Sequence, residues 1–280
     1  MATVTRSVRE VCEEAKAASH VLARVGRDAK DACLKDLAGR LEGRSAELLE
    51  ANRADLEAGR EEGLNDALID RLTLTEERIS EMAAGVREIA GLEDPVGELV
   101  ESWTLENGLR VRKERVPIGV VAIVYEARPN VTIDAAALCL KSGNAAVLRG
   151  SSSAETSNAF LAGLVREALA AAELPEAATS LLEGGGHEQL RELATQEGLV
   201  DLIIPRGGEG LERALKEVAK VPVMYAAAGN CHVYVHEDAD LSMAQRIAYN
   251  AKVQRPGVCN SAETLLVHRK VASVLLPAAI

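Results

Sequence analysis

The stretch that decides the fold is PIGVVAIVYEARPNVTIDAAALCLKSGNAAVLR, which runs from Pro117 to Arg149. It opens on an unbroken apolar run from Gly119 to Tyr125, continues as a helical segment from Thr132 to Gly143, and becomes apolar again at Ala145. Short apolar runs without polar alternation are typical of strands that are buried on both faces of a parallel sheet. A helix between two such strands predicts a crossover connection.

The same alternation continues toward the C-terminus. A helix is expected from about Ala154 to Ala172, and the segments SLLE at 180–183 and DLIIP at 201–205 are each followed by glycines and a helical pattern. Strands that alternate with helices indicate an α/β fold, here a doubly wound parallel sheet of the kind that binds nucleotides.

Helices and a hairpin precede this sheet. Over residues 1–91, apolar residues recur at three- and four-residue spacing among charged ones, which predicts an antiparallel helical layer. Thr73 or Thr75 is suited to cap the last of these helices, and Gly91 to end it. Residues 102–116 alternate polar and apolar side chains around Asn107-Gly108, which predicts a hairpin with a two-residue turn.

Two domains are expected from this organisation. Residues 1–234 would form a nucleotide-binding domain that includes the helical layer, with the hairpin at about 100–116 interpreted as part of an oligomerisation arm. Residues 235–280 would begin a second α/β domain.

Composition narrows the class of partner. The chain has 280 residues, 48% of them hydrophobic, and a formal net charge of −11. No basic run with interleaved aromatic residues is present, so neither a nucleic acid nor an anionic membrane is an expected partner. The apolar runs are too short to span a bilayer, and the N-terminus lacks the apolar region of a signal peptide. We therefore expect a cytoplasmic protein that acts on a small molecule.

The cysteines and histidines predict neither disulfides nor a metal site. The five cysteines include no C-x-x-C pair, and four of them, Cys12, Cys33, Cys139 and Cys231, lie in apolar periodic segments where a thiol usually behaves as a small buried hydrophobe. His232 and His236 share one face of a predicted strand, but no third ligand has suitable spacing.

The loops that follow the predicted strands carry candidate anion ligands. In parallel α/β sheets, ligands bind at the carboxyl ends of the strands. Two of these loops offer guanidinium, hydroxyl and backbone N–H donors for the phosphates of a nucleotide. Their candidate cofactor-binding residues are Arg149, Gly150, Ser151, Ser152, Arg206, Gly207 and Gly208. Each loop taken alone is also compatible with a tight turn followed by a helix cap.

Cys259 differs from the other cysteines in its surroundings. It lies in the loop QRPGVCNS, from Gln254 to Ser261, between a predicted helix at about 241–251 and an apolar strand. Arg255 and open backbone amides near the thiol would favour the reactive thiolate. The alternative is a structural cysteine in the same loop.

Long ordered blocks of the chain resemble one family. These blocks are the stretch from Pro117 to Gly150, DLIIPRGG, GNCHVYV and QRPGVCNSAET. The chain is similar to the γ-glutamyl phosphate reductases, also called glutamate-5-semialdehyde dehydrogenases, of the aldehyde dehydrogenase superfamily. The resemblance implies an aldehyde-dehydrogenase-like fold and the NADPH-dependent reduction of L-glutamyl 5-phosphate to L-glutamate 5-semialdehyde and phosphate, a step of proline biosynthesis.

The resemblance also implies roles for individual residues. Cys259 matches the nucleophile, which would form a thioester with the acyl group. By superfamily analogy, the Asn130 amide and the backbone N–H of Cys259 would stabilise the oxyanion. Arg128 or Arg255 would hold the acyl phosphate or the substrate carboxylate, and which does which stays open. A salt bridge that merely orders the loop is the alternative for either arginine.

Two departures from ordinary aldehyde dehydrogenases refine this expectation. Those enzymes place a glutamate general base in the segment that reads MYAAAGN here, at 224–230, and its absence favours reduction over hydrolysis. The loop after Arg149 carries serines where an NAD-preferring enzyme would place a carboxylate, which favours NADP.

Members of the family continue beyond the last residue of this chain, which implies that residues 235–280 are the start of a catalytic domain that this chain leaves incomplete. We therefore expect the chain to be the N-terminal two thirds of a reductase that forms homo-oligomers at full length. Two alternatives are a non-catalytic remnant, which binds a nucleotide or a pathway partner such as glutamate 5-kinase, and a reductase of another acyl phosphate or acyl thioester.

Overall fold

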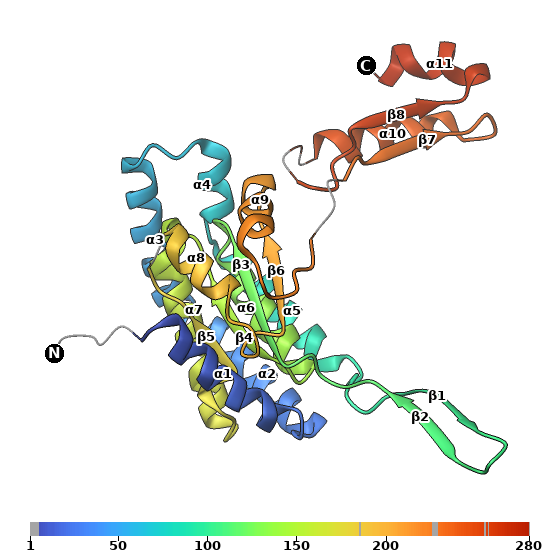
Figure 1. The fold of residues 1–280 in the computed structure, drawn as a ribbon. Helices are drawn as coiled ribbons and strands as arrows, with labels where there is room; N and C mark the ends of the chain where they lie inside the picture. The colour runs from blue at the N-terminus through green and yellow to red at the C-terminus, as the bar shows by residue number, and fades with distance from the viewer. Residues whose placement is uncertain (1–5, 185, 226–228, 255, 257, 280) are drawn as a thin grey trace. The chain divides into compact units, whose positions relative to one another are not determined.

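A computed structural model describes residues 6–184, 186–225, 229–254, 256 and 258–279. The chain divides into two compact units, residues 1–225 and 226–280, which are described separately below (Figure 1). Within the described residues, no helix combines the length and the apolar character needed to cross a membrane.

The first unit begins with the predicted helical layer. Its helices are α1 (Val8–Leu22), α2 (Arg27–Gly43), α3 (Ser45–Glu61), α4 (Asp66–Leu72) and α5 (Glu76–Gly91). The Thr75 side chain accepts a hydrogen bond from the backbone N–H of Arg78, and α5 ends at Gly91, as predicted. The leucines of α2 and the apolar stripe of α5 are buried in one shared cluster, so the amphipathic pattern is satisfied by packing between helices.

The hairpin is present, but its turn is longer than predicted. Strands β1 (Leu99–Thr104) and β2 (Arg110–Glu114) pair antiparallel, and the Leu105 N–H donates to the Leu109 carbonyl over 2.9 Å. Three residues, Glu106 to Gly108, therefore close the loop. Gly108 has φ +84°, the left-handed conformation that ends a three-residue hairpin loop.

A four-stranded parallel sheet forms the centre of the first unit. Strands β3 (Val120–Tyr125), β4 (Ala145–Arg149), β5 (Thr179–Leu181) and β6 (Leu202–Arg206) lie in the order β5-β4-β3-β6. The connecting helices are α6 (Asn130–Lys141), α7 (Glu155–Ala171) and α8 (His187–Ala194), and α9 (Glu209–Val218) follows β6. The strand order reverses between β5 and β6, which confirms the predicted doubly wound α/β architecture.

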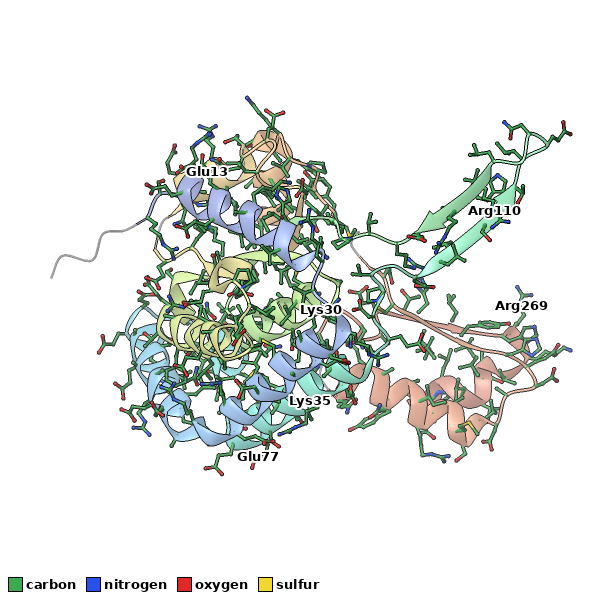
Figure 2. All side chains as sticks on the ribbon, turned by 90° about the horizontal axis from the view of Figure 1, so that it is seen from below. Glu13, Lys30, Lys35, Glu77, Arg110 and Arg269 are labelled. Carbon is green, nitrogen blue, oxygen red and sulfur yellow. The ribbon has the colours of Figure 1, made fainter. Side chains whose placement is uncertain are left out.

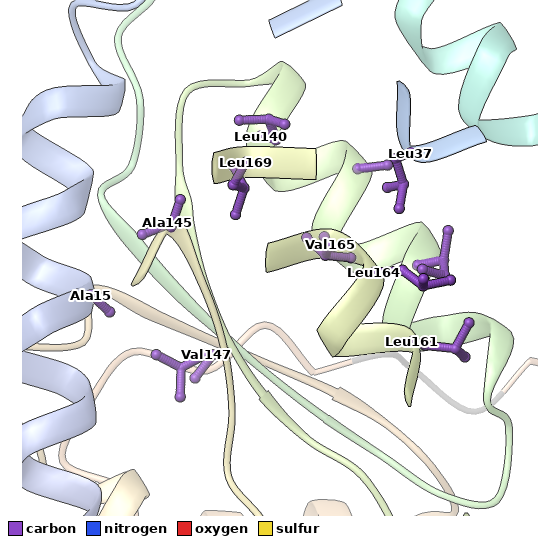
Figure 3. Packing of buried hydrophobic residues seen from close by; sticks show 14 of the residues in the cluster. Ala15, Leu37, Leu140, Ala145, Val147, Leu161, Leu164, Val165 and Leu169 are labelled. Atoms are coloured by element: carbon purple, nitrogen blue, oxygen red, sulfur yellow. The ribbon is translucent and has the colours of Figure 1, made fainter. Parts of the chain in front are cut away.

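The sheet is covered on both faces. Every residue of β3 is buried. Val120, Ala122 and Val124 belong to the large core cluster, which also contains Ala15 of α1. The alternate residues Val121, Ile123 and Tyr125 pack with Val131 and Cys139 of α6 in a second cluster. Figure 3 shows Ala15 on one side of the strands and the leucines of α7 on the other.

The second unit is a small α/β arrangement. It contains β7 (His232–Val235), α10 (Leu241–Val253), β8 (Thr264–Val267) and α11 (Arg269–Ala279), and β7 pairs parallel with β8. This pairing explains why the compact units divide after residue 225, whereas the sequence analysis placed the boundary after residue 234. Because β7 has its only strand partner among the described residues in β8, it groups with the C-terminal elements.

A buried ion pair ties the helical layer to the start of the hairpin. The Lys30 side chain of α2 is fully buried, and its Nζ lies 2.5 Å from Asp94 Oδ2. Lys30 Nζ also donates to the Lys141 carbonyl over 3.2 Å. Asp94 immediately precedes Pro95, at the point where the chain leaves α5 for the hairpin. Losing one partner of such a pair leaves an uncompensated charge.

We expect Lys30→Met to lower the free energy of unfolding by about 3–5 kcal/mol, because it strands the Asp94 carboxylate. Urea denaturation followed by circular dichroism would measure this loss. The control is Lys35→Met on the same helix, where the side chain is exposed and the change should stay within about 0.5 kcal/mol. Figure 2 labels both lysines. Equal losses in the two variants would contradict the proposed role of the ion pair.

Candidate active site

A cavity of about 330 Å³ opens at the carboxyl ends of β3, β4 and β5. One part of its wall is polar and is formed by the loop between β4 and α7. Another part is apolar and includes Leu182, Leu190, Leu211 and Ala214. A concave site with an apolar wall and a few convergent polar groups is typical of cofactor pockets.

Four predicted cofactor residues line this cavity together: Arg149, Gly150, Ser151 and Ser152. The Arg149 guanidinium donates to the Gly186 carbonyl over 2.9 Å, which places it against the loop after β5. Burial lowers the pKa of Arg149 from its ordinary value. The Ser151 and Ser153 hydroxyls are 2.8 Å apart, and Ser151 Oγ also accepts from the Ser153 N–H. The loop is therefore ordered by its own hydrogen bonds.

The wall beneath this loop is a buried polar network that sequence reasoning missed. The Tyr125 and Thr132 hydroxyls lie 2.7 Å apart, and Thr132 Oγ1 donates to Asn158 Oδ1 over 2.9 Å. Asn158 is only 2% exposed and lines the cavity. A Cβ at Gly150 would lie 2.2 Å from Asn158 Nδ2. Only glycine lets the loop pack this closely on the amide.

Helix α3 holds the start of α7 in place. The buried Asp55 carboxylate accepts hydrogen bonds from the Thr156 N–H over 3.0 Å and from the Ser157 N–H over 2.8 Å. These amides are among those that a helix leaves unpaired at its N-terminus. A carboxylate from another element therefore caps α7, which fixes the direction of the Arg149–Ser153 loop.

The cavity also carries negative charge that the sequence analysis did not assign. Glu126, Glu155 and Glu183 all line it. These carboxylates repel a phosphate, so an anionic ligand would have to place its charge near Arg149 and the serines.

The second predicted cofactor loop is placed differently. Arg206 ends β6, and Gly207 and Gly208 follow it. All three are exposed, and none of them is among the described residues that line the cavity. The Gly208 N–H, at the start of α9, donates to Glu126 Oε1 over 3.0 Å. A carboxylate of the chain thus occupies the position where a phosphate was expected.

The predicted oxyanion residue begins the helix that follows β3. Asn130 is the first residue of α6, and its Nδ2 donates to Asp134 Oδ2 over 3.0 Å. Burial raises the pKa of the Asp134 carboxyl, and the Asn130 hydrogen bond opposes this shift. Arg128 lies in the connection between β3 and α6, where its backbone N–H donates to the Glu126 carbonyl.

The predicted nucleophile lies in the second unit. Cys259 is exposed, in a turn in which the Ser261 N–H donates to the Val258 carbonyl over 3.1 Å. Arg255, the other predicted substrate ligand, lies outside the described residues. Since Cys259 and the cavity belong to different units, their meeting with Asn130 at one acyl carbon stays a prediction.

One cysteine does not match its predicted environment. Cys12, Cys33 and Cys139 are buried as expected, and burial raises the pKa of each thiol to about 12. Cys231 is only partly buried, and its Sγ donates to the Cys259 carbonyl over 3.3 Å. This contact follows from the pairing of β7 with β8, which the local sequence pattern does not specify.

The comparisons with known proteins agree with this architecture. Residues 2–279 match the sequence model of the aldehyde dehydrogenase family. The γ-glutamyl phosphate reductase of Moorella thermoacetica is 51% identical over 274 residues, covering 98% of this chain and 66% of the relative. That of Thermobifida fusca is 50% identical over 280 residues, covering 100% of this chain and 67% of the relative.

A solved structure is similar over the same length. The crystal structure of γ-glutamyl phosphate reductase from Thermotoga maritima superposes with a TM-score of 0.90 at 43% identity, covering 98% of this chain and 66% of that one. The chain spans about two thirds of the length of these relatives. From the family match along almost its whole length and from its α/β fold, the chain belongs to the aldehyde dehydrogenase family.

Proposed function

We propose that the chain supplies the nucleotide-binding part and the nucleophile of an enzyme that reduces L-glutamyl 5-phosphate to L-glutamate 5-semialdehyde in proline biosynthesis. The observation that carries this proposal is the similarity of the whole chain to γ-glutamyl phosphate reductases. The exposed thiol of Cys259 supports it, because a nucleophile must be accessible to its substrate.

In the proposed reaction, Cys259 is the group that attacks. Its thiolate would add to the acyl carbon, and phosphate would leave as the bond from that carbon to the phosphate oxygen breaks. The acyl group would then be held as a thioester on Cys259. The nicotinamide cofactor, when bound, supplies the hydride that reduces this group. Cys259 would finally release the aldehyde and regain its thiol.

Stabilisation of the oxyanion is assigned to Asn130 and to the backbone N–H of Cys259. Loss of one such donor typically slows the chemical step by about 10²–10³-fold. Asn130 must exchange its bond to Asp134 for one to the substrate, and the two side chains are adjacent on α6. Arg128 or Arg255 would hold the acyl phosphate or the substrate carboxylate, since a guanidinium binds both in a bidentate manner.

The cavity residues fit a nicotinamide dinucleotide phosphate. Arg149, Ser151 and Ser152 would hold phosphate oxygens, and the close approach at Gly150 would bring backbone groups against the ligand. The apolar wall suits a base. Arg206, Gly207 and Gly208 would join the site when the ligand displaces Glu126 from the Gly208 N–H. NADP is preferred in this proposal because Arg149 and the serines can hold a 2′-phosphate.

The full-length protein is proposed to be a cytoplasmic homo-oligomer that has a transient contact with the kinase that makes the labile acyl phosphate. The support for an oligomer is the hairpin, in which the side chains of Leu99, Val100, Trp103 and Leu109 are all exposed. Figure 2 shows its side chains, including Arg110, standing free of the helices of the same unit. Exposed apolar strands of this kind are usually covered by a partner.

Cys259→Ala should abolish the reaction. We expect phosphate-dependent reduction of NADP by glutamate 5-semialdehyde to fall by more than about 10⁴-fold, because the proposed thioester forms on the Cys259 thiol. The measurement uses protein extended to the length of the relatives, with and without the substitution, beside the present chain. Binding of NADPH, followed by fluorescence, is the control and should be unchanged. Full activity in the variant would exclude Cys259 as the nucleophile.

Gly150→Ala should weaken NADPH binding by about tenfold, which is 1.4 kcal/mol, because the added methyl pushes the loop away from Asn158. Titration calorimetry on the chain would measure this loss of affinity. The control is Gly163→Ala on α7, where a Cβ meets no atom within 4 Å. Asn158→Ala combined with Gly150→Ala should restore part of the affinity for NADPH.

The same titrations on the unmodified chain compare the two cofactors. NADPH should bind more tightly than NADH, and tighter binding of NADH would overturn the choice of cofactor.

Trp103→Asp in the hairpin should shift the full-length protein toward monomers, because a charge replaces an apolar contact side chain. Light scattering coupled to size-exclusion chromatography gives the mass. An exposed apolar residue outside the hairpin, such as Val21 on α1, provides the matched control variant Val21→Asp. A monomeric mass for the unmodified full-length protein would contradict the oligomer itself.

A further inference from the structure

We propose that Cys231 and Cys259 form an oxidation site, in which a peroxide oxidises Cys259 and Cys231 then closes a disulfide with it. Neither the fold nor the proposed reaction requires the second cysteine. The inference therefore rests on the contacts within the second unit.

The two cysteines are in direct contact. The Cys231 Sγ lies 3.3 Å from the Cys259 carbonyl oxygen. That oxygen is two bonds from the Cys259 Cα, so the Cys231 sulfur lies beside the backbone that carries the other side chain. Disulfides form between cysteines whose Cα atoms are about 4.4–6.8 Å apart, a range compatible with this contact.

Backbone hydrogen bonds hold both residues at the same end of the β7/β8 pair. The Cys231 carbonyl accepts from the Glu263 N–H over 2.9 Å and from the Thr264 N–H over 3.1 Å. The Thr264 hydroxyl also donates to Asn230 Oδ1 over 3.0 Å. Cys231 is thus attached to the start of β8, and the turn at Cys259 precedes that start by a few residues.

The same turn is anchored on its other side. The Ala262 N–H donates to the Ala251 carbonyl of α10 over 2.9 Å, and Ser261 is buried. Because both ends of the contact are tied to regular elements, we expect the disulfide to close mainly by rotation of the two cysteine side chains. This distinguishes the pair from two cysteines that merely lie on one surface.

Accessibility makes the site selective among the five cysteines. Cys259 is exposed and Cys231 is partly exposed, whereas Cys12, Cys33 and Cys139 are buried. Oxidation follows thiolate character and exposure, and a sensor cysteine commonly has a second thiol beside it. The raised pKa values of the buried thiols protect them further.

The chemistry balances with a peroxide as the oxidant. The Cys259 thiolate attacks one peroxide oxygen, the O–O bond breaks, and hydroxide leaves to give a sulfenic acid. The Cys231 sulfur then attacks the Cys259 sulfur, the S–O bond breaks, and the departing hydroxide takes the Cys231 proton as water. Two thiols have lost two electrons to one peroxide. A thiol reductant reverses the step by exchange.

The consequence for catalysis rests on the proposed function. A nucleophile held in a disulfide cannot attack the acyl phosphate, so oxidation would switch the enzyme off reversibly and protect Cys259 from sulfinic acid. The disulfide itself can be tested without any activity.

The test is peptide mapping of the reduced chain after exposure to hydrogen peroxide. Free thiols are blocked with an alkylating agent, and the protein is digested with trypsin without reduction. We expect the peptides 221–246 and 253–269, which carry Cys231 and Cys259, to appear as one linked mass. Reduction with dithiothreitol should separate them. The buried cysteines of the same digest serve as internal controls and should appear as alkylated thiols after denaturation.

Cys231→Ser provides the second arm, with Cys231→Ala beside it and circular dichroism to verify folding. Both variants should accumulate the Cys259 sulfenic acid, trapped by dimedone, and then the sulfinic acid. Equal yields of these products in the unmodified chain, without the linked peptide, would overturn the proposal, as would links formed only between two chains. In the extended protein, dithiothreitol should restore activity lost to peroxide in the unmodified form and fail to restore it in the variants. Should the extended protein lack activity, the linked peptide would still decide the disulfide.

Discussion

The parallel pairing of β3 with β4 on one side and β6 on the other is the constraint on which the first unit depends. Every residue of β3 is buried, so each backbone N–H and C=O of the strand must find a partner in a neighbouring strand. Asp201 aligns β6 with β3, since its Oδ2 accepts from the Val120 N–H over 2.8 Å and pairs with Lys16 of α1. This register places the ends of β3, β4 and β6 at one edge, where the candidate cofactor loops lie.

The residues that line the cavity at this edge have a fixed geometry, because buried polar groups hydrogen-bond the helices behind it to one another. Asn158 faces the loop, and its carbonyl oxygen is held by Thr132, which Tyr125 holds in turn. Asp55 caps α7 from α3. A buried network in which every polar group is hydrogen-bonded favours a single geometry. Moving one member breaks a hydrogen bond in a site of low dielectric, which destabilises the folded state. The helical layer thus does more than cover the sheet, since it also orients the loop from Arg149 to Ser153.

Most of the architecture could be predicted from local pattern. The apolar runs at β3 and β4, the cap at Thr75 and the helix end at Gly91 all express short-range rules, and the structure confirms them. The three-residue turn at Gly108 differs from its prediction because Asn-Gly suits more than one loop length.

Contacts between segments that are distant in the sequence were harder to predict. The hydrogen bond from the Gly208 N–H to Glu126 joins residues that are 82 positions apart, and no local sequence pattern in either loop predicts it. The apolar neighbours of Cys231 in the sequence predicted a buried core residue. Its contact with Cys259 depends on the pairing of β7 with β8, which only the structure shows.

Electrostatics set the requirement that the candidate site must meet. The chain carries a net charge of −11, and Glu126, Glu155 and Glu183 line the cavity, so the overall electrostatic potential disfavours an anionic cofactor or substrate. Binding of phosphate must therefore come from directional donors at short range, where a charge-assisted hydrogen bond outweighs distant repulsion. Arg149 and the serines meet that need in the first unit. The hydrogen bond between Glu126 and the Gly208 N–H is an interaction of this kind within the chain. The unpaired amides at a helix N-terminus attract any carboxylate or phosphate that can reach them. A dinucleotide that reached both loops would have to compete with this internal carboxylate, so the free energy of binding reports the exchange of one anion for another.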